Sequence, residues 1–318
     1  MTAPDPIAAI AEALEAPLAA RLLAAWAAVI GTASEGALLA ALGAPTLLDQ
    51  IARIEALLGG PLDSALSGAL IEPLSRAAVG GVAAAVLPPG GAATVAGRFA
   101  VLNPRAAGWA AGYSARLVRQ IGDDQRSWLR SVLAGGYTGE HHPRVTAKVI
   151  RQQIGLTSAM AGWVENYRAS LAGLPPDTRD AAAALYADRL RRGRALTIAR
   201  TETLHASNFG QHLAWNELIA ARDVDAASAR RVWIAKPESG RTCPFCRALH
   251  GTVVGLNDLF VHPEKPARQA LVPPIHPRCR CSVALRLDHA GAIHWSDPRE
   301  RVGGWRVIAP TPASAGGA

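Results

Sequence analysis

The chain has 318 residues, of which half are hydrophobic and only 5% are aromatic. A sequence this apolar can bury a core, which excludes a wholly disordered chain, and its length allows two or three domains. The formal net charge is +8, but residues 1–100 carry −4 and residues 101–318 carry +12. Such a basic segment is typical of proteins that meet nucleic acid, although a solvated arginine-rich surface explains the same charge without a partner.

No secretory signal is visible, because the first residues, Met-Thr-Ala-Pro-Asp-Pro, lack a basic region. No apolar run reaches about 18–20 residues without a charge, and Arg21 interrupts the most apolar stretch, 16–30. We therefore expect a protein without a membrane partner, made in a reducing cytoplasm.

The first ninety residues read as helices. Apolar residues recur every three or four positions over 6–30, which predicts a helix. Two further helices are predicted over 35–58, with a break at Pro45, and over 62–87. The Pro- and Gly-rich stretch 87–97 is the predicted boundary or hinge.

The middle of the chain is also predicted to be helical, with a loop at 135–143 and Asp177 as a helix N-cap. The helices expected there cover 104–134, 144–154, 157–172, 177–193 and 194–222. After residue 230 the pattern changes, and short strands are predicted at 231–237 and 283–287.

The predicted fold is a mainly α-helical body with a small C-terminal α+β Cys-rich module that zinc would stabilise. Four parts are expected in chain order: an Ala-rich helical region over 1–90, a helical body over 98–230, the Cys-rich module over 231–290 and a tail over 291–318.

All cysteines of the chain lie in that module. Cys243 and Cys246 form a C-x2-C turn, and Cys279 and Cys281 form a C-x-C pair shortly after His276. A C-x2-C turn points two thiolates at one ion, and alternation in an extended segment places the C-x-C pair on one face, with Arg280 pointing away. Four thiolates suit a tetrahedral Zn²⁺, and His276 is a fifth candidate ligand.

Other interpretations of the cysteines stay open. They could form a reduced or disulfide-bridged packing cluster, or one of them could be a redox or catalytic thiol. The spacing is not that of an ordinary zinc ribbon, where C-x2-C occurs twice. A ββα-metal nuclease needs a catalytic His pair beside the metal, and the His141-His142 pair lies about a hundred residues upstream. We predict no catalytic residue.

A stripe of mainly polar residues follows one face of the long helix predicted over 194–222. Their spacing of three or four places predicts a polar network rather than a di-iron site, which needs a second Glu-x-x-His motif. They are Glu202, His205, Phe209, His212 and Asn216. We expect Glu202 to be buried and paired with Arg241 or Arg280.

A cluster of arginines surrounds Gly193. Guanidinium groups at this density could grip phosphates, and a solvated helix face is the alternative. The cluster consists of Arg191, Arg192, Arg194 and Arg200.

Three motifs of the C-terminal half occur in order: IARTETLHASNFGQHLAW from residue 198, WIAKPESGRTCPFCRALHG from residue 233 and PPIHPRCRC from residue 273. Together they resemble the phage Mu F-like family of head morphogenesis (minor capsid) proteins. The resemblance covers about 194–287, and the helical hairpin before it looks like the segment that often precedes the core in this family. The matching positions are Thr201, Glu202, Asn208, Trp233, Arg241, Cys243, Cys246, Leu249, Gly251, His276, Cys279, Arg280 and Cys281.

Two positions depart from the family pattern. The acidic residue before the C-x2-C turn is usually Asp, and here Glu238 stands one residue further out. His250 replaces the Asp that usually precedes Gly251. Both changes weaken any role for these acids in metal binding or catalysis.

The resemblance implies a protein present in a few copies at the portal or inside the procapsid, which assists assembly and DNA delivery. Some relatives continue into a toxin or an ADP-ribosyltransferase, and the short segment after Leu287 leads us to expect no such enzyme here.

The predicted function is therefore that of a non-enzymatic phage or prophage minor head protein. Portal or major capsid protein and packaged DNA are its expected partners. We expect it in the capsid interior or at the portal vertex of the virion, and in the host cytoplasm during assembly. The alternatives are a zinc-stabilised nucleic-acid-binding protein and, with less support, a metal-dependent nuclease.

Overall fold

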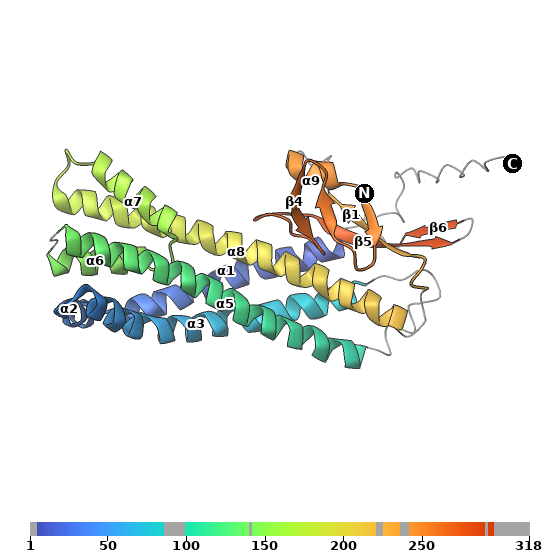
Figure 1. Cartoon of the computed structure of the whole chain (residues 1–318), viewed down its shortest axis with the longest axis horizontal. Coiled ribbons are helices and arrows are strands. Elements are labelled where there is room, and N and C mark those ends of the chain that lie inside the picture. Colours follow the sequence, from blue (N-terminus) through green and yellow to red (C-terminus); the bar gives the residue numbers. More distant parts are fainter. Residues whose placement is uncertain are drawn as a thin grey trace. The chain divides into compact units, whose positions relative to one another are not determined.

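A computed structural model describes residues 5–85, 99–139, 142–220, 225–235, 242–289 and 292–295. The described chain is mainly helical, with two small sheets in its C-terminal part (Figure 1). The predicted fold class is thus confirmed.

The helices follow the predicted order. They are α1 (Pro6–Thr32), α2 (Glu35–Leu42), α3 (Leu47–Ala83), α5 (Phe99–Thr138), α6 (Pro143–Gln153), α7 (Ser158–Ser170), α8 (Pro176–Ala220) and α9 (Pro244–Leu249).

The predicted break at Pro45 is confirmed, since residues 43–46 separate α2 from α3. Three other helix predictions need correction. The second half of the helix expected over 35–58 and the helix expected over 62–87 are one 37-residue helix, α3, which continues through Pro61 and Pro73. The expected loop at 135–143 is helical up to Thr138. The two helices expected on either side of Gly193 are one 45-residue helix, α8, which begins at Pro176, so that Asp177 lies inside the first turn.

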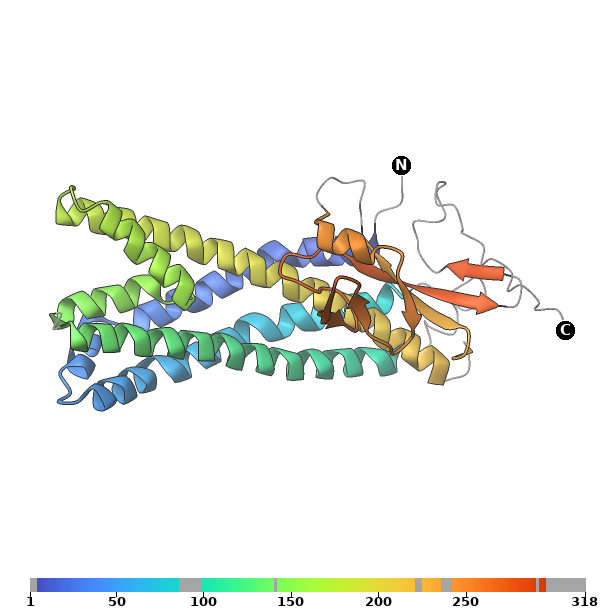
Figure 2. The same ribbon diagram turned by 45° about the horizontal axis from the view of Figure 1, so that its top comes forward.

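The larger sheet has four antiparallel strands in the order β2-β1-β5-β6, drawn in orange to red in Figure 2. Its strands are β1 (Ala229–Ile234), β2 (Val253–Gly255), β5 (Ser282–His289) and β6 (Ala292–Trp295). In the register of the two central strands, Arg231 faces Leu285 and Trp233 faces Val283. A separate hairpin pairs β3 (Phe260–His262) with β4 (Lys265–Ala270).

The chain packs into two compact units. The module unit comprises Met1–Ala11, Ala77–Ala106 and Leu204–Ala318, and the bundle unit comprises Glu12–Arg76 and Ala107–Thr203. Helices α1, α3, α5 and α8 therefore each contribute to both units. The predicted hinge 87–97 lies outside the described residues, and within the predicted tail 291–318 the described residues 292–295 form β6.

In the bundle unit, the turn between α6 and α7 requires a glycine. Gly155 has φ +87°, and a Cβ on it would lie 2.8 Å from the indole of the fully buried Trp26. The guanidinium of Arg194 donates to the Gly155 carbonyl over 3.0 Å and stands 5.7 Å from the Trp26 ring. Arg191 donates to the carbonyls of Ile154 and Gln152 over 2.8 and 2.6 Å.

In the module unit, α3 and α8 cross at very short range. A Cβ on Gly81 would lie 1.9 Å from the carbonyl oxygen of Ser207, and a Cβ on Gly210 would lie 1.9 Å from that of Ala78. Because each glycine faces the backbone of the other helix, only a missing side chain permits this approach.

Two helices, α1 and α3, are long and apolar enough to cross a membrane by length and composition, with hydropathies of 1.5 and 1.2. Core helices of water-soluble proteins pass the same test. In α1 the side chains of Leu18, Leu22 and Trp26 are fully buried on one face, as in a core helix. The absence of a membrane partner stays a prediction.

Candidate metal centre

The C-x2-C turn forms the start of helix α9. Cys243 is the N-cap residue, Pro244 opens the helix, and the backbone N–H of Cys246 donates to the Cys243 sulfur over 3.4 Å. A sulfur in this position satisfies a helix N–H that has no partner within the helix. Both sulfurs therefore lie on the same side of a short, well-defined turn.

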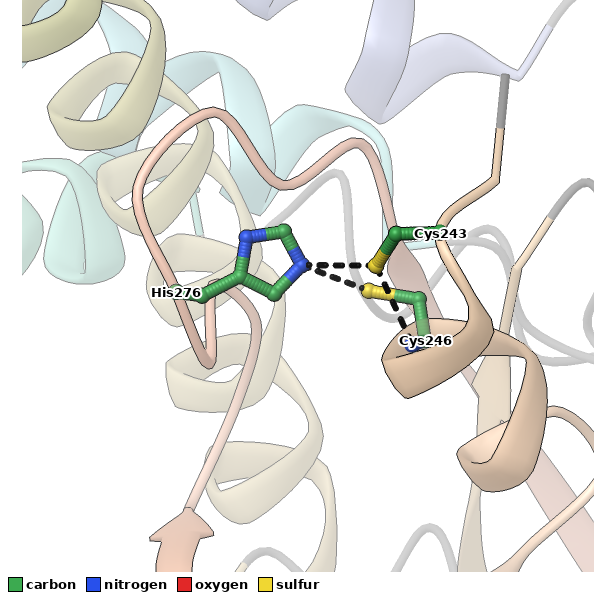
Figure 3. Close-up of side chains that lie close together, drawn as sticks. All are labelled: Cys243, Cys246 and His276. Atoms are coloured by element: carbon green, nitrogen blue, oxygen red, sulfur yellow. Dashed lines mark hydrogen bonds between the residues drawn. The ribbon is translucent and has the colours of Figure 1, made fainter.

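His276 brings its imidazole to this turn from the loop before β5 (Figure 3). Its Nε2 lies 3.3 Å from the sulfur of Cys243 and 2.9 Å from that of Cys246. Its Nδ1 lies 2.8 Å from the carbonyl oxygen of Pro277, which can only accept a hydrogen bond. The proton is therefore on Nδ1, and the Nε2 lone pair faces the sulfurs, as a metal-ligating histidine requires.

The C-x-C segment completes the cluster. Cys279 and Cys281 are almost fully buried while Arg280 between them is exposed, so the predicted alternation is confirmed. The sulfur of Cys279 lies 3.7 Å from that of Cys246. With Zn–S bonds of about 2.3 Å, tetrahedral geometry places two sulfurs about 3.8 Å apart.

All four cysteines are free thiols. Two sets of three ligand atoms lie within 4.8 Å of one another, and both contain Cys246: one adds Cys243 and His276, the other Cys279 and Cys281. The cluster could hold a metal ion. Because its atoms form two overlapping groups, a single tetrahedral ion would take four of the five candidates.

The thiols of the cluster influence one another's protonation. Hydrogen bonds from the side chains of Cys246 and Cys281 stabilise the thiolate of Cys279 and hold its pKa well below its usual value. The hydrogen bond to Cys279 raises the pKa of Cys246, which stays protonated in the metal-free cluster. One thiolate, the form that binds metal, is thus present beside neutral thiols.

Two residues outside the cluster hold the C-x-C segment in place. Asn208 in α8 is fully buried, donates to the carbonyls of Leu204 and Cys281, and accepts from the N–H of Val283 over 3.2 Å. Asp5, the residue before α1, accepts from the hydroxyl of Ser282 over 2.8 Å. The sequence pattern singled out Asn208 through the family resemblance, whereas nothing in it indicated Asp5 or Ser282.

Strand β1 contributes buried aromatic and charged side chains to the core of the module. Trp233 in β1 packs edge-on against Phe260, and both are fully buried. The equally buried Arg231 stands 5.1 Å from the Phe260 ring and donates to the carbonyls of Leu271 and Asp258. Burial lowers the pKa of Arg231 to about 10. Arg231 therefore holds a positive charge inside the module, where carbonyl oxygens accept its hydrogen bonds.

The other positions of the family pattern have local structural roles. Leu249 is fully buried and Gly251 has φ +80°, while the hydroxyl of Thr201 donates to the Thr197 carbonyl. His250, one of the two departures, accepts from the Ala235 N–H over 3.2 Å. Arg241 and Glu238 lie outside the described residues.

Glu202 is half-buried, and of its two predicted partners Arg280 does not pair with it, while Arg241 lies outside the described residues. No described arginine pairs with Glu202: its carboxylate accepts from the Tyr113 hydroxyl over 2.5 Å. Burial raises the pKa of Glu202, and burial followed by the charge of Glu202 raises that of Tyr113. Further along the same face, Asn216 donates to His212, whose pKa burial lowers to about 4.

The arginine cluster around Gly193 does not form a phosphate grip. The guanidinium groups of Arg191 and Arg194 donate hydrogen bonds to backbone carbonyls of the α6–α7 turn. Arg192 pairs with Asp188, and Arg200 donates to Glu15 over 2.7 and 2.9 Å.

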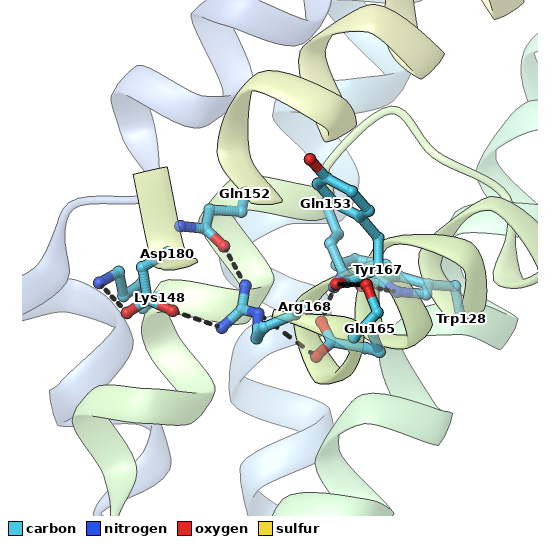
Figure 4. Close-up of polar contacts among 9 residues, drawn as sticks. Trp128, Lys148, Gln152, Gln153, Glu165, Tyr167, Arg168 and Asp180 are labelled. Atoms are coloured by element: carbon cyan, nitrogen blue, oxygen red, sulfur yellow. Dashed lines mark hydrogen bonds and ion pairs between the residues drawn. The ribbon is translucent and has the colours of Figure 1, made fainter. Parts of the chain in front are cut away.

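A polar network links α6, α7 and α8 in the bundle unit (Figure 4). Asp180 lies 2.7 Å from Lys148 and 3.3 Å from Arg168, and Arg168 donates to Gln152. The hydrogen bond from Lys148 holds the pKa of Asp180 below its usual value. A hollow of about 330 Å³ lies beside this network, with Trp128 and Gln153 in its wall.

Comparison with known proteins agrees with the motifs. No curated protein and no solved structure gives a significant match. Residues 146–284 match the family model described as Phage Mu protein F like protein. The match includes all five candidate metal ligands and the α6–α7 hairpin except its first residues. Over residues 146–284 the match confirms the resemblance to Mu F-like phage proteins that the motifs indicated.

Proposed function

We propose that the protein is a minor head protein of a phage or prophage that acts in procapsid assembly at the portal and performs no catalysis. The observation that carries the proposal is the Mu F-like match over 146–284, whose cysteines and histidine converge in one cluster. Portal or major capsid subunits are its proposed partners, and the capsid interior or portal vertex its place in the virion.

The proposed docking surface is the outward side of α1. Its exposed positions are largely alanine, among them Ala20, Ala24 and Ala27, whereas its bulky residues are buried. A flat face without long side chains lets another helix approach closely. Because α1 and α3 contribute to both units, deleting residues 1–90 would damage both, and surface substitutions test the idea better.

The experiment co-expresses the full chain with the portal and major capsid proteins of the same phage or prophage and measures incorporation into procapsids. The variant carries Ala20→Glu, Ala24→Glu and Ala27→Glu, which keep helix propensity but place charges on the docking face. We expect incorporation to be lost. The matched control changes three exposed alanines elsewhere, Ala111, Ala115 and Ala181, and should be incorporated normally.

Absence of the wild-type chain from procapsids would contradict the head-protein proposal itself. Normal incorporation of the α1 variant would move the docking surface to another part of the chain.

We further propose that the cluster holds one structural zinc ion. Soft thiolates with one imidazole are ligands that zinc prefers, and four protein ligands would complete a tetrahedral shell without a position for a catalytic water. The Nε2 orientation of His276 favours a set of Cys243, Cys246, His276 and Cys279, with Cys281 as the remaining thiol.

Elemental analysis of the full chain, purified without chelator, tests this proposal and should give one zinc per chain. Cys246→Ser should lose the metal, because this residue belongs to both ligand groups. Cys281→Ser should retain more zinc than Cys279→Ser. A metal-free protein with two disulfides would show that the cysteines serve as covalent cross-links.

The nuclease alternative gains no support from the described residues. His142 caps α6 by accepting from the Arg144 N–H, and His141 lies outside the described residues. The nucleic-acid-binding alternative is favoured by one observation, the exposed cations around the cluster.

A further inference from the structure

Four exposed cations surround the Cys–His cluster. Arg247 follows Cys246 in α9, Lys265 and Arg268 lie in strand β4, and Arg280 stands between the two cysteines of the C-x-C pair. None of the four makes an ion pair with any described residue. Their charges are therefore available to an outside partner.

The four cations belong to segments that meet at the cluster. The 3.7 Å contact between the sulfurs of Cys246 and Cys279 brings the segments of Arg247 and Arg280 together. The ammonium of Lys265 stands 5.8 Å from the ring of Phe245, the residue before Cys246. That ring stacks on His262 of β3 at 3.8 Å, which places the β3–β4 hairpin, to which Arg268 belongs, beside α9.

Few acids oppose these charges. Within 242–287 the carboxylates are those of Asp258 and Glu264, against the four exposed cations, Arg278 and Arg286. The buried guanidinium of Arg231 donates to carbonyl oxygens, so its charge adds to the positive electrostatic potential of the module. A concentration of one sign of charge over a small area attracts polyanions.

Many cations of the helices are instead neutralised. Arg130 pairs with Glu55 at 2.7 Å, Arg200 with Glu15 at 2.7 Å, and Arg192 with Asp188. Exposed arginines without an ion pair to a described residue also occur there, but they are scattered, with two in α5 and one each in α3, α6 and α8. They are Arg53, Arg116, Arg119, Arg151 and Arg189.

We propose that Arg247, Lys265, Arg268 and Arg280 form a surface that binds the phosphate backbone of duplex DNA without regard to sequence. This inference rests on the proposed function, since packaged DNA is the polyanion that a protein inside a phage head meets. The ammonium group of Lys265 and the guanidinium groups of the arginines can bind phosphates, while the Cys–His cluster holds their segments together.

The test measures binding of the full-length protein to a fluorescently labelled 30-base-pair duplex of arbitrary sequence by anisotropy at several salt concentrations. Four phosphate contacts predict a slope of log K against log[salt] of about −3.6, hence a roughly 150-fold loss of affinity between 50 and 200 mM salt. The variant with Gln at all four positions should lose most of this affinity and nearly all of the slope.

The control replaces Arg53, Arg119, Arg151 and Arg189 by Gln, which removes the same net charge from scattered helical positions. It should keep the slope of the wild-type protein. A second variant, Lys265→Gln with Arg268→Gln, changes only the β4 strand away from the cysteines and should reduce the magnitude of the slope by about 1.8. Unchanged zinc content and circular dichroism would show that these variants fold.

Equal losses in the cluster variant and its helical control would overturn the proposal, because net charge alone would then explain binding. Binding of poly-glutamate but not of duplex DNA would also overturn it, in favour of an acidic protein partner. Incorporation into procapsids is measured separately. A chain that enters procapsids but fails to bind DNA refutes this inference and leaves the proposed function standing.

Discussion

The close crossing of α3 and α8 makes a quantitative prediction about Gly210. An alanine there would place its Cβ 1.9 Å from the Ala78 carbonyl oxygen, whereas an ordinary contact begins at 3.4 Å. The helices would have to separate by about 1.5 Å, because a backbone carbonyl cannot rotate away. Overpacking of this kind costs about 1–3 kcal/mol, and a clash with backbone belongs at the upper end.

Helix propensity acts in the opposite direction, since Ala stabilises a helix interior by about 1 kcal/mol relative to Gly. We therefore expect Gly210→Ala to destabilise the module unit by about 2 kcal/mol net. Gly193→Ala, in the same helix, is the control: a Cβ there meets no atom within 4 Å, so this substitution should be neutral or stabilising.

The measurement is urea unfolding of the full chain, followed by circular dichroism and tryptophan fluorescence. Gly81→Ala probes the same crossing from the other helix. Once one alanine has separated the helices, the second costs less, so the double variant should be less destabilised than the sum of the single variants. Zinc retention should fall as well, because α8 carries Asn208, which bonds to the Cys281 carbonyl. A stabilised Gly210→Ala protein would refute the close crossing.

Three further predictions concern buried polar groups. Burial lowers the pKa of His212 to about 4 in the fold, against 6.5 in the unfolded chain. The free energy of unfolding should therefore be at its full value above pH 6.5 and fall by about 3 kcal/mol as the pH drops to 4. His212→Gln should flatten this part of the pH profile of urea unfolding. Because burial raises the pKa of Glu202, its ionisation makes folding less favourable as the pH rises above 4.5. Glu202→Gln keeps an acceptor for the Tyr113 hydroxyl and should therefore be neutral or stabilising at pH 7. A clear destabilisation at pH 7 that vanishes at pH 4 would instead indicate a cationic partner. Asn208→Ala should leave the Val283 N–H without its acceptor and lower the free energy of unfolding by about 1–3 kcal/mol. It should also lower zinc retention in a chelator competition. Unchanged retention would show that the C-x-C segment holds its position without the Asn208 side chain.

Local sequence pattern determined the identity of the helices and the ligand types of the candidate site. In α1, apolar residues recur every three or four positions, and this period alone predicted 6–30 against the observed Pro6–Thr32. Likewise, the alternation of the C-x-C pair follows from extended backbone geometry, so the burial of Cys279 and exposure of Arg280 needed no tertiary information.

Helix ends were less predictable, because prolines and glycines give signals that packing can override. Pro61 and Pro73 each remove one backbone hydrogen bond, yet α3 continues through both. Leucines on one face of this helix, such as Leu66 and Leu70, are fully buried, and their burial offsets the lost bonds. Gly193 lies inside α8 for the same reason, since Ala195 and Ala199 after it pack in the core.

The partners of charged and polar groups were decided by the tertiary structure alone. The sequence left open whether Arg191 and Arg194 belong to a phosphate site or to a solvated helix face, and in the structure both bond to carbonyls of the α6–α7 turn. Glu202 pairs with Tyr113, 89 residues earlier. The contact between Asp5 and Ser282 joins residues 277 positions apart. Side-chain periodicity describes which face of an element is buried, whereas a hydrogen bond between distant residues depends on how whole helices and strands are placed, and no local pattern encodes that placement.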